Sequence, residues 1–289
     1  MQEHSFPTRP LLSCRLAACL LLLAALALSS CVAITARAQT APAPNVVSGA
    51  SLPDAPKPQA PTRDDVTIRN TPRNILRDQG AIWSSPVRVR PRDLEWLAPL
   101  ALATGAAIAT DHRAMTQVVS RNPDFNHANV DASNALIGLW IASPVAVYGY
   151  GHFRQDAHAR EAGVVSAESM LDAVVVEQGM KLIFWRERPN VDNARGHFFQ
   201  SSAGVDSSFP SSHSLVAWSA AAALAGESSS HWTQFALYTG AAGVGITRIM
   251  GQEHFPSDGL VGSATGWLLG HYVVRRHHHP QLTGHNSRR

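Results

Sequence analysis

Cysteine is absent from most of this chain: Cys14, Cys19 and Cys31 all lie close to the N-terminus. The rest of the 289 residues can therefore form no disulfide bond and offers no thiolate nucleophile. An exported protein of this length can still fold without disulfides, because it is large enough to bury a sizeable core.

Charged residues are also few, at 16% of the sequence, with a formal net charge of +3 and an apolar share of 45%. This balance excludes a disordered chain and is typical of a globular or membrane-associated protein. No dense block of Lys and Arg occurs between Gln39 and Val274, so the sequence does not indicate nucleic-acid binding. The mild positive charge suits an anionic substrate.

Signals for β-structure are missing, because there is no sustained two-residue alternation and no Asn-Gly hairpin, and no internal repeat is found. Apolar, Ala-rich stretches instead predict six helices. These helices are expected at about Leu94–Thr110, Ala135–Tyr150, Val164–Glu187, His213–Gly226, Thr233–Met250 and Gly259–Val274. The predicted fold class is all-α, a six-helix bundle that forms one domain over residues 93–276.

The N-terminus is typical of an export signal. Arg9 and Arg15 precede an apolar run at residues 16–28, and this run is shorter than a membrane span. We expect residues 1–38 to be a signal peptide or lipoprotein leader. Cleavage after Ala38 is one outcome. Lipidation at Cys31 is another, because Leu28-Ser29-Ser30-Cys31 resembles a bacterial lipoprotein box. A retained transmembrane helix is the alternative.

Two segments outside the helical region differ in composition from it. Residues 39–92 hold nine prolines and are predicted to be a linker, largely disordered and extended, in which residues 68–82 can dock on the domain surface. The basic, His-rich tail at residues 277–289 is predicted to be solvated. It is not interpreted as a metal site, because no acidic or cysteine residues flank it.

The first of three segments that concentrate unusual side chains runs from Lys181 to Pro189. Lys181 and Arg188 are seven positions apart, so on a helix they would lie on one face, two turns apart. A guanidinium and an ammonium projecting from the end of an apolar helix can together bind one anion, and Pro189 would then end the helix. Arg186, between them, is a further basic residue near the site; a residue that supports the phosphate-binding groups is one interpretation, and a solvated charge is the one we favour.

The second segment runs from Phe209 to His213. Pro210 favours the start of a helix, where Ser211 and Ser212 would offer hydroxyls and free backbone N–H groups. Such a helix start can bind phosphate, and His213 would lie in the same first turn.

The third segment runs from Thr247 to Asp258 and supplies another cation, Arg248. His254 and Asp258 are four positions apart across a predicted helix start. Asp258 can therefore accept a hydrogen bond from one imidazole nitrogen and leave the other free to attack. Each residue has a structural alternative, such as a helix cap for Ser211 or Asp258. Only their combination and order favour phosphate chemistry.

Together the three segments resemble the signature of the type 2 phosphatidic acid phosphatase superfamily. This superfamily includes bacterial class A acid phosphatases, lipid phosphatases and vanadium haloperoxidases. Its pattern is Lys-x6-Arg-Pro, then Pro-Ser-Gly-His, then Ser-Arg-x5-His-x3-Asp. The chain departs from it twice, with Ser212 in place of glycine and Thr247 in place of serine. The resemblance covers about residues 93–276.

The resemblance implies a role for each matching residue. His254 would attack phosphorus and form a phosphohistidine, Asp258 would orient it, and His213 would protonate the leaving oxygen and then activate water. No metal and no other cofactor is implied, because positive side chains would stabilise the charge of the transferring phosphoryl group. The implied phosphate-binding residues are Lys181, Arg188, Ser211, Ser212 and Arg248.

The expected function is metal-independent hydrolysis of phosphate monoesters, with lipid phosphates and diphosphates among the substrates left open. A vanadate-dependent haloperoxidase is an alternative, because the same residues can hold vanadate, although those enzymes are usually much larger. A non-catalytic phosphate- or lipid-binding module is another, since a serine at position 212 loses the φ > 0 freedom of glycine and can crowd the site. Oligomeric state and substrate identity stay open.

The location of the protein is predicted to be the periplasm or cell envelope. Uncharged runs of about 15 to 20 residues are at the lower edge of membrane-spanning length, and Glu168, Asp172 and Glu177 would be costly in lipid. A cleaved leader followed by six spans would also place the third helix end on the opposite side from membrane members of the superfamily. We therefore favour a soluble or peripheral bundle, with lipidation at Cys31 or an integral inner-membrane protein with an outward-facing site as alternatives.

Overall fold

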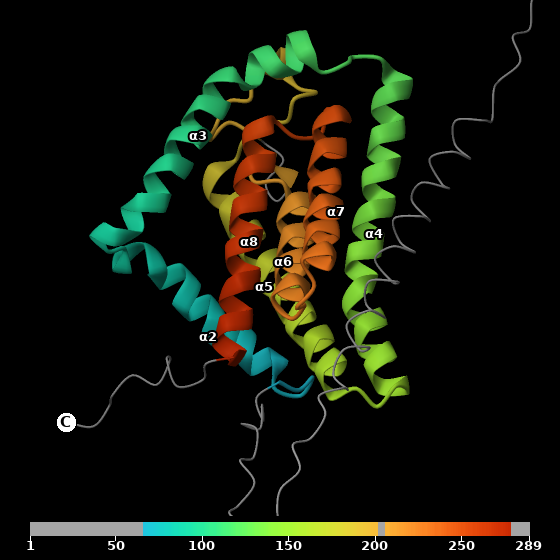
Figure 1. The fold of residues 1–289 in the computed structure, drawn as a ribbon. Coiled ribbons are helices and arrows are strands. Elements are labelled where there is room, and N and C mark those ends of the chain that lie inside the picture. The colour runs from blue at the N-terminus through green and yellow to red at the C-terminus, as the bar shows by residue number, and fades with distance from the viewer. Residues whose placement is uncertain (1–65, 202–205, 279–289) are drawn as a thin grey trace, which may run out of the picture.

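The computed structural model describes residues 66–201 and 206–278, and all regular secondary structure within these ranges is helical (Figure 1). The all-α prediction is confirmed, and each predicted helix corresponds to one of α3 to α8. The helices are α2 (Thr71–Ser84), α3 (Leu94–Arg113), α4 (Pro123–Phe153), α5 (Ala157–Phe184), α6 (Ser212–Gly226), α7 (His231–Met250) and α8 (Pro256–His278). Short helical turns lie at Ser85–Arg88, Pro91–Asp93, Ala114–Val118 and Asp192–Ala194.

Several helices begin earlier than the apolar pattern predicts, because polar caps precede the apolar residues. Asn122 accepts a hydrogen bond from the Phe125 N–H at the start of α4, and Asp156 does the same for the Ala159 N–H at the start of α5. Such caps satisfy N–H groups that have no partner inside the helix. They fix where the chain turns into each long helix.

Helix α6 is the centre of the bundle and packs against α4, α5, α7 and α8 (Figure 1). Its alanines at 217 and 220–223 are fully buried, so it can lie close to its neighbours. On α8, glycines recur every fourth position at the contact with α6: a Cβ at Gly262 would lie 2.7 Å from the Ser211 carbonyl oxygen, and one at Gly270 would lie 2.5 Å from the Ala222 Cβ. This close contact holds the N-termini of α6 and α8 side by side.

The predicted linker contains α2, so the expectation of disorder over residues 39–92 is wrong for Thr71–Ser84. The predicted docking of residues 68–82 is confirmed, because α2 packs on α5, where the Trp83 ring lies against Gly179. Proline does not prevent this helix, because Pro72 lies in its first turn, where an N–H would have no helical partner. Residues 39–65 of the predicted linker lie outside the described residues.

The start of the predicted tail is also ordered, because α8 continues to His278. His277 is buried and its Nε2 lies 2.9 Å from a Glu168 carboxylate oxygen, while the Nε2 of His278 lies 3.0 Å from Glu227. The prediction of a solvated tail is therefore wrong for His277, whereas His278 is exposed at the end of α8. Their acidic partners are distant in the sequence and close only in the fold. The N-terminal leader and residues 279–289 lie outside the described residues.

The acidic residues of α5 do not face outward. Glu168 and Asp172 are fully buried and Glu177 is 2% exposed, so all three point into the bundle. The argument that they keep α5 out of lipid is therefore wrong, because a carboxylate inside the protein does not meet the surrounding medium.

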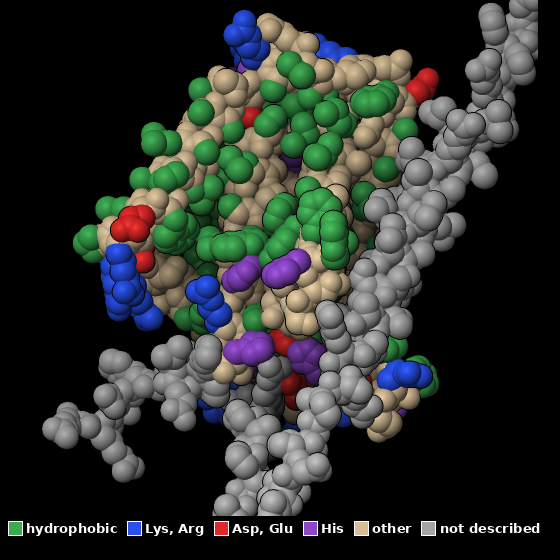
Figure 2. All heavy atoms as spheres, viewed as in Figure 1, with side chains coloured by type: hydrophobic (Ala, Val, Ile, Leu, Met, Phe, Trp, Pro, Cys, Tyr) green, Lys and Arg blue, Asp and Glu red, His purple; other side chains and the backbone are tan. Residues whose placement is uncertain are grey.

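Apolar side chains instead cover much of the outer surface. Figure 2 shows them over most of the face that α3, α7 and α8 present, with Leu102, Ile246 and Trp267 among those exposed. Helix α4 is long and apolar enough to cross a membrane: its most apolar 18-residue window has a mean hydropathy of 1.4, and 17% of that window is buried. This surface is compatible with membrane association.

Candidate active site

The three segments of unusual residues meet where α5 and α7 end and where α6 and α8 begin (Figure 1). The helix that contains the start of the first segment ends earlier than expected. Helix α5 ends at Phe184, and Trp185 follows with a left-handed φ of 38°. Arg188 therefore lies in the loop beyond the helix. The prediction that Lys181 and Arg188 share a helical face is wrong, and Pro189 does not end the helix.

The three predicted phosphate-binding cations are all paired with carboxylates. Lys181 Nζ lies 2.8 Å from Glu177 Oε1. A single oxygen of Glu253, Oε2, lies 2.6 Å from Arg188 Nη1 and 3.1 Å from Arg248 Nη2. Two of the three cations, from segments 60 positions apart in the sequence, therefore converge on one point.

His213 is close enough to these cations for their charges to change its protonation. Burial lowers the pKa of His213 to about 3, and the positive charges of Arg248, Lys181 and Arg188 and the neighbouring His254 act in the same direction. Its Nε2 lies 3.4 Å from Asn134 Oδ1 of α4. The fold thus brings both predicted catalytic histidines and all three cations into one electrostatic environment, in which His213 is neutral while no anion is bound.

His254 is 1% exposed, and its Nδ1 lies 2.8 Å from the Ser208 carbonyl oxygen. The nearest Asp258 oxygen is 3.7 Å from the same nitrogen, beyond hydrogen-bond range. A carbonyl can only accept, so Nδ1 carries the proton and Nε2 keeps a free lone pair. Burial lowers the pKa of His254, which favours this neutral form.

Asp258 is fully buried in the first turn of α8. It positions His254 indirectly, through hydrogen bonds to neighbouring residues. Its Oδ2 accepts hydrogen bonds from Ser208 Oγ, at 2.5 Å, and from the Phe255 N–H, at 2.8 Å. It therefore fixes the two chain segments that flank the imidazole, the residue whose carbonyl accepts from Nδ1 and the residue that follows His254. Its negative charge also stabilises a positive imidazole nearby.

Arg186 is not a solvated charge, because it is 1% exposed and is the largest fully buried side chain in the described part of the protein. Its guanidinium lies 2.6 Å from Asp258 Oδ1 and 2.7 Å from Asp111 Oδ2 of α3. The Phe198 and Phe255 rings lie 4.6 and 4.1 Å from its central carbon. A buried guanidinium needs such partners to offset the loss of water, and here they tie α3 to the His254 segment.

Asp111, Glu177 and Glu253 are site residues that the sequence analysis missed. Asp111 accepts from the Ser257 N–H at 3.1 Å and from the Ser257 hydroxyl. The available signal was a single carboxylate at the end of a helix that is otherwise apolar between Leu97 and Thr110. Its partner could not be read from the sequence, because it lies 75 positions away.

The serines of the second segment have different surroundings. Ser211 is buried as the N-cap of α6, and its Oγ accepts from Ser214. Its predicted role in binding phosphate stays a prediction. Ser212 is the first residue of α6, with a helical backbone that does not require glycine, and its Oγ donates to Glu177 at 2.7 Å. The hydroxyl therefore bonds to the same carboxylate oxygen that holds Lys181, and the predicted role of Ser212 in binding phosphate stays a prediction.

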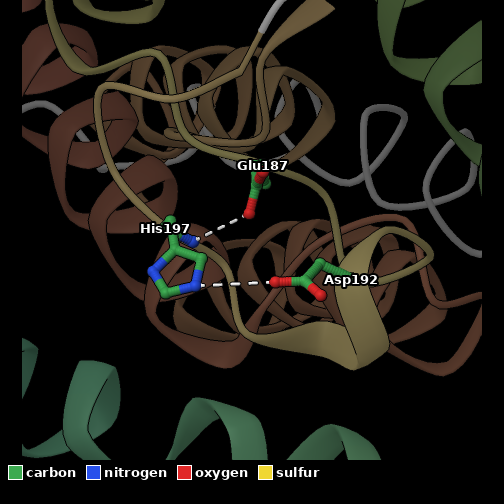
Figure 3. Close-up of side chains that lie close together, drawn as sticks. All are labelled: Glu187, Asp192 and His197. Carbon is green, nitrogen blue, oxygen red and sulfur yellow. Dashed lines mark hydrogen bonds and ion pairs between the residues drawn. The ribbon is translucent and has the colours of Figure 1, made fainter.

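A separate cluster in the loop after α5 joins Glu187, Asp192 and His197 (Figure 3). One ligand atom from each lies within 4.8 Å of the others, which is a spacing that can hold a metal ion. His197 Nε2 lies 3.6 Å from Asp192 Oδ2, and its backbone N–H donates to Glu187. Asp192 and His197 are exposed, and exposed groups of this kind are common without an ion, so the cluster carries no assignment.

Comparison with known proteins gives one finding. Residues 162–280 match the family model of the PAP2 superfamily. No curated protein and no solved structure matches the chain. The match spans α5 to the end of α8 and includes all eight predicted site residues. The match confirms the predicted resemblance to the type 2 phosphatidic acid phosphatase superfamily over these residues.

Proposed function

We propose that this protein is an exported, metal-independent phosphatase that hydrolyses phosphate monoesters through a phosphohistidine on His254. The match of residues 162–280 to the PAP2 superfamily supports a hydrolase of the phosphatase type that acts on phosphorylated small molecules or lipids. The further details of mechanism and substrate are our proposal.

The observation that carries the proposal is the state of His254 close to Arg188 and Arg248. Its Nδ1 is committed to the Ser208 carbonyl, and its burial favours the neutral ring, so Nε2 is a nucleophile at neutral pH. Arg188 and Arg248 already share one oxygen atom, as they would share an oxygen of a phosphoryl group. Fixed positive charge of this kind stabilises the equatorial oxygens of the transferring group.

The reaction would proceed in two steps. Nε2 of His254 forms a bond to phosphorus while the ester P–O bond breaks, and the leaving oxygen takes a proton from His213. Neutral His213 then removes a proton from water, the resulting hydroxide forms a P–O bond, and the N–P bond breaks to release phosphate. During the first step His254 becomes positive, and the carboxylate of Asp258 stabilises that charge.

The test is the substitution His254→Ala, with turnover of an aryl phosphate as the measurement. Loss of the nucleophile should lower kcat by on the order of 100- to 10,000-fold. His231→Ala is the matched control, because His231 is an exposed histidine at the N-terminus of α7, at the other end of that helix from Arg248. Its activity should equal that of the wild type. A His254→Ala protein that keeps most of its activity would remove the assignment.

A further inference from the structure

Glu253 has contacts that the proposed mechanism does not use. It directly precedes His254 in the turn between α7 and α8, and its backbone N–H donates to the Arg248 carbonyl at 3.1 Å. Its side chain is 26% exposed, and the single oxygen Oε2 accepts from both Arg188 and Arg248. A carboxylate oxygen between two guanidinium groups makes the same contacts that a phosphate oxygen would make.

Several other donors of the two arginines already have partners. Arg188 gives its Nε–H to the Asp206 carbonyl at 3.0 Å, and Arg248 directs Nη1 to Ser133 Oγ at 3.4 Å. Nε of Arg248 is buried without a hydrogen-bond partner. A buried guanidinium N–H without a partner is costly, and an incoming oxyanion would satisfy it. Besides this nitrogen and Arg188 Nη2, which lies 4.0 Å from Asp206 Oδ1, the donors that phosphate can use include those that Glu253 occupies.

The carboxylate on the third cation differs from Glu253 in two respects. Glu177 is 2% exposed, and its Oε1 also accepts from Ser212, so it is fixed inside the bundle. An ammonium has three donors, and Lys181 can keep Glu177 while it binds a phosphate oxygen. Glu253 is partly open to solvent, so its side chain can rotate away at little cost in desolvation.

We propose that Glu253 occupies the anion position between Arg188 and Arg248 and is displaced when a phosphoryl group binds. The inference rests on the proposed function of the site. While the site is empty, the carboxylate holds the two guanidinium groups in place and offsets their mutual repulsion. An incoming group must bind more strongly than a carboxylate does. This favours a dianion, such as a phosphate monoester, over a monoanion.

The competing interpretation is that Glu253 is a permanent support that positions the arginines with phosphate bound. The two roles predict opposite effects of Glu253→Gln, which keeps the size of the side chain and removes its charge. If Glu253 is displaced, removing its charge should strengthen phosphate binding, because the anion no longer competes with a carboxylate. If Glu253 is a permanent support, removing its charge should weaken binding, because the arginines lose the group that positions them.

The experiment measures the dissociation constant of inorganic phosphate by calorimetry and its competitive inhibition constant against an aryl phosphate. We expect both constants to fall roughly tenfold in Glu253→Gln, the scale of one charge-assisted hydrogen bond that no longer has to be broken. The affinity for dimethyl phosphate, a monoanion that would displace the same carboxylate, should rise as well. Asp192→Asn is the matched control, because it removes one negative charge from an exposed residue of the nearby loop, and it should leave both constants unchanged.

An unchanged or weaker affinity for phosphate in Glu253→Gln, with the wild type active, would overturn the role of Glu253 and leave the proposed function intact. A wild-type protein that neither binds phosphate nor hydrolyses the aryl phosphate would overturn both.

Discussion

At the scale of single residues, the charge of His213 depends on whether the site holds an anion. Burial and nearby positive charges lower the pKa of His213 to about 3, so its ring is neutral at any physiological pH. A general acid must carry a proton to give to the leaving group. A bound phosphate dianion cancels part of the positive charge around His213, so binding itself can create the acid that the reaction needs.

The expected result is a rise of about 1 to 3 units in the pKa of His213 when phosphate or vanadate binds, the usual effect of an adjacent opposite charge. Histidine NMR titrations with and without the anion would measure it, with His213→Ala to assign the resonance. The protonated ring would then persist to higher pH in the complex than in the free protein. A pKa of His213 that does not change on binding would contradict its role as the acid.

The sequence predicted the types of residue at the site better than the bonds between them. The order of Lys181, Arg188, Arg248 and the two histidines was enough to indicate phosphate chemistry. The partners of Arg186 were not visible, because Asp111 and Asp258 lie on α3 and α8, at opposite ends of the domain sequence. A buried arginine and a solvated one look alike until the elements around them are known.

At the scale of elements, α2 is held to the bundle by a buried polar cluster. Asp78 bonds with Tyr272, at 3.0 Å, and with Arg276 of α8, and Gln79 donates to Asp172 of α5 at 2.8 Å. Burial, opposed by the hydrogen bond from Gln79 and reinforced by the nearby charges of Asp78 and Glu168, raises the pKa of Asp172 to about 7. The folded protein therefore keeps a proton on Asp172 at a pH where the unfolded chain has lost it.

This raised pKa predicts the pH dependence of stability. Between pH 4 and 7 the folded state binds the extra proton, so this contribution to the free energy of unfolding falls as the pH rises, by up to roughly 4 kcal/mol at about 1.4 kcal/mol per unit. Asp172→Asn removes the titration while its amide oxygen can still accept from Gln79. Urea unfolding at pH 5 and pH 8 should show the variant gaining stability relative to the wild type at pH 8.

Asp192→Asn is the control for the stability experiment, because Asp192 is exposed. Equal pH dependence of the wild type and Asp172→Asn would show that Asp172 is not the titrating group.

The apolar pattern predicted α3 to α8, since it marks the stretches that can be buried. It missed α2, because a Pro-rich composition hides a helix whose stability comes from contacts with α5 and α8.

At the scale of the whole molecule, many large apolar side chains lie on the outer surface, while several charged side chains are buried inside the bundle. Leu171, Val174 and Ile183 of α5 are exposed, while the buried charged side chains of the same helix point inward: Glu168, Asp172, Glu177 and Lys181. The sequence could not predict this arrangement, because charge counted along a helix does not tell which side faces the core. The four-residue spacing of glycines on α8 likewise has a meaning only when α6 is known to lie against it.

We expect this surface to bind lipid. The purified protein should float with phosphatidylglycerol–phosphatidylcholine vesicles in a density gradient and should need detergent to remain monodisperse, because exposed apolar area of this extent is costly in water. Replacing Ile141 and Val145, two exposed residues of α4, by serine should reduce flotation without loss of helix content. Protein that stays in the aqueous fraction and is monodisperse without detergent would contradict membrane association.

The central claim is that the phosphoryl group is transferred from substrate to His254 and forms a covalent phosphohistidine before hydrolysis. The most direct test is to trap that intermediate. Wild-type protein mixed with an aryl phosphate, quenched in alkali within milliseconds and digested, should yield a peptide phosphorylated on His254 by mass spectrometry. Alkali is used because phosphohistidine is destroyed by acid. Rapid turnover with no phosphorylated histidine, or with the phosphoryl group on another residue, would contradict the account.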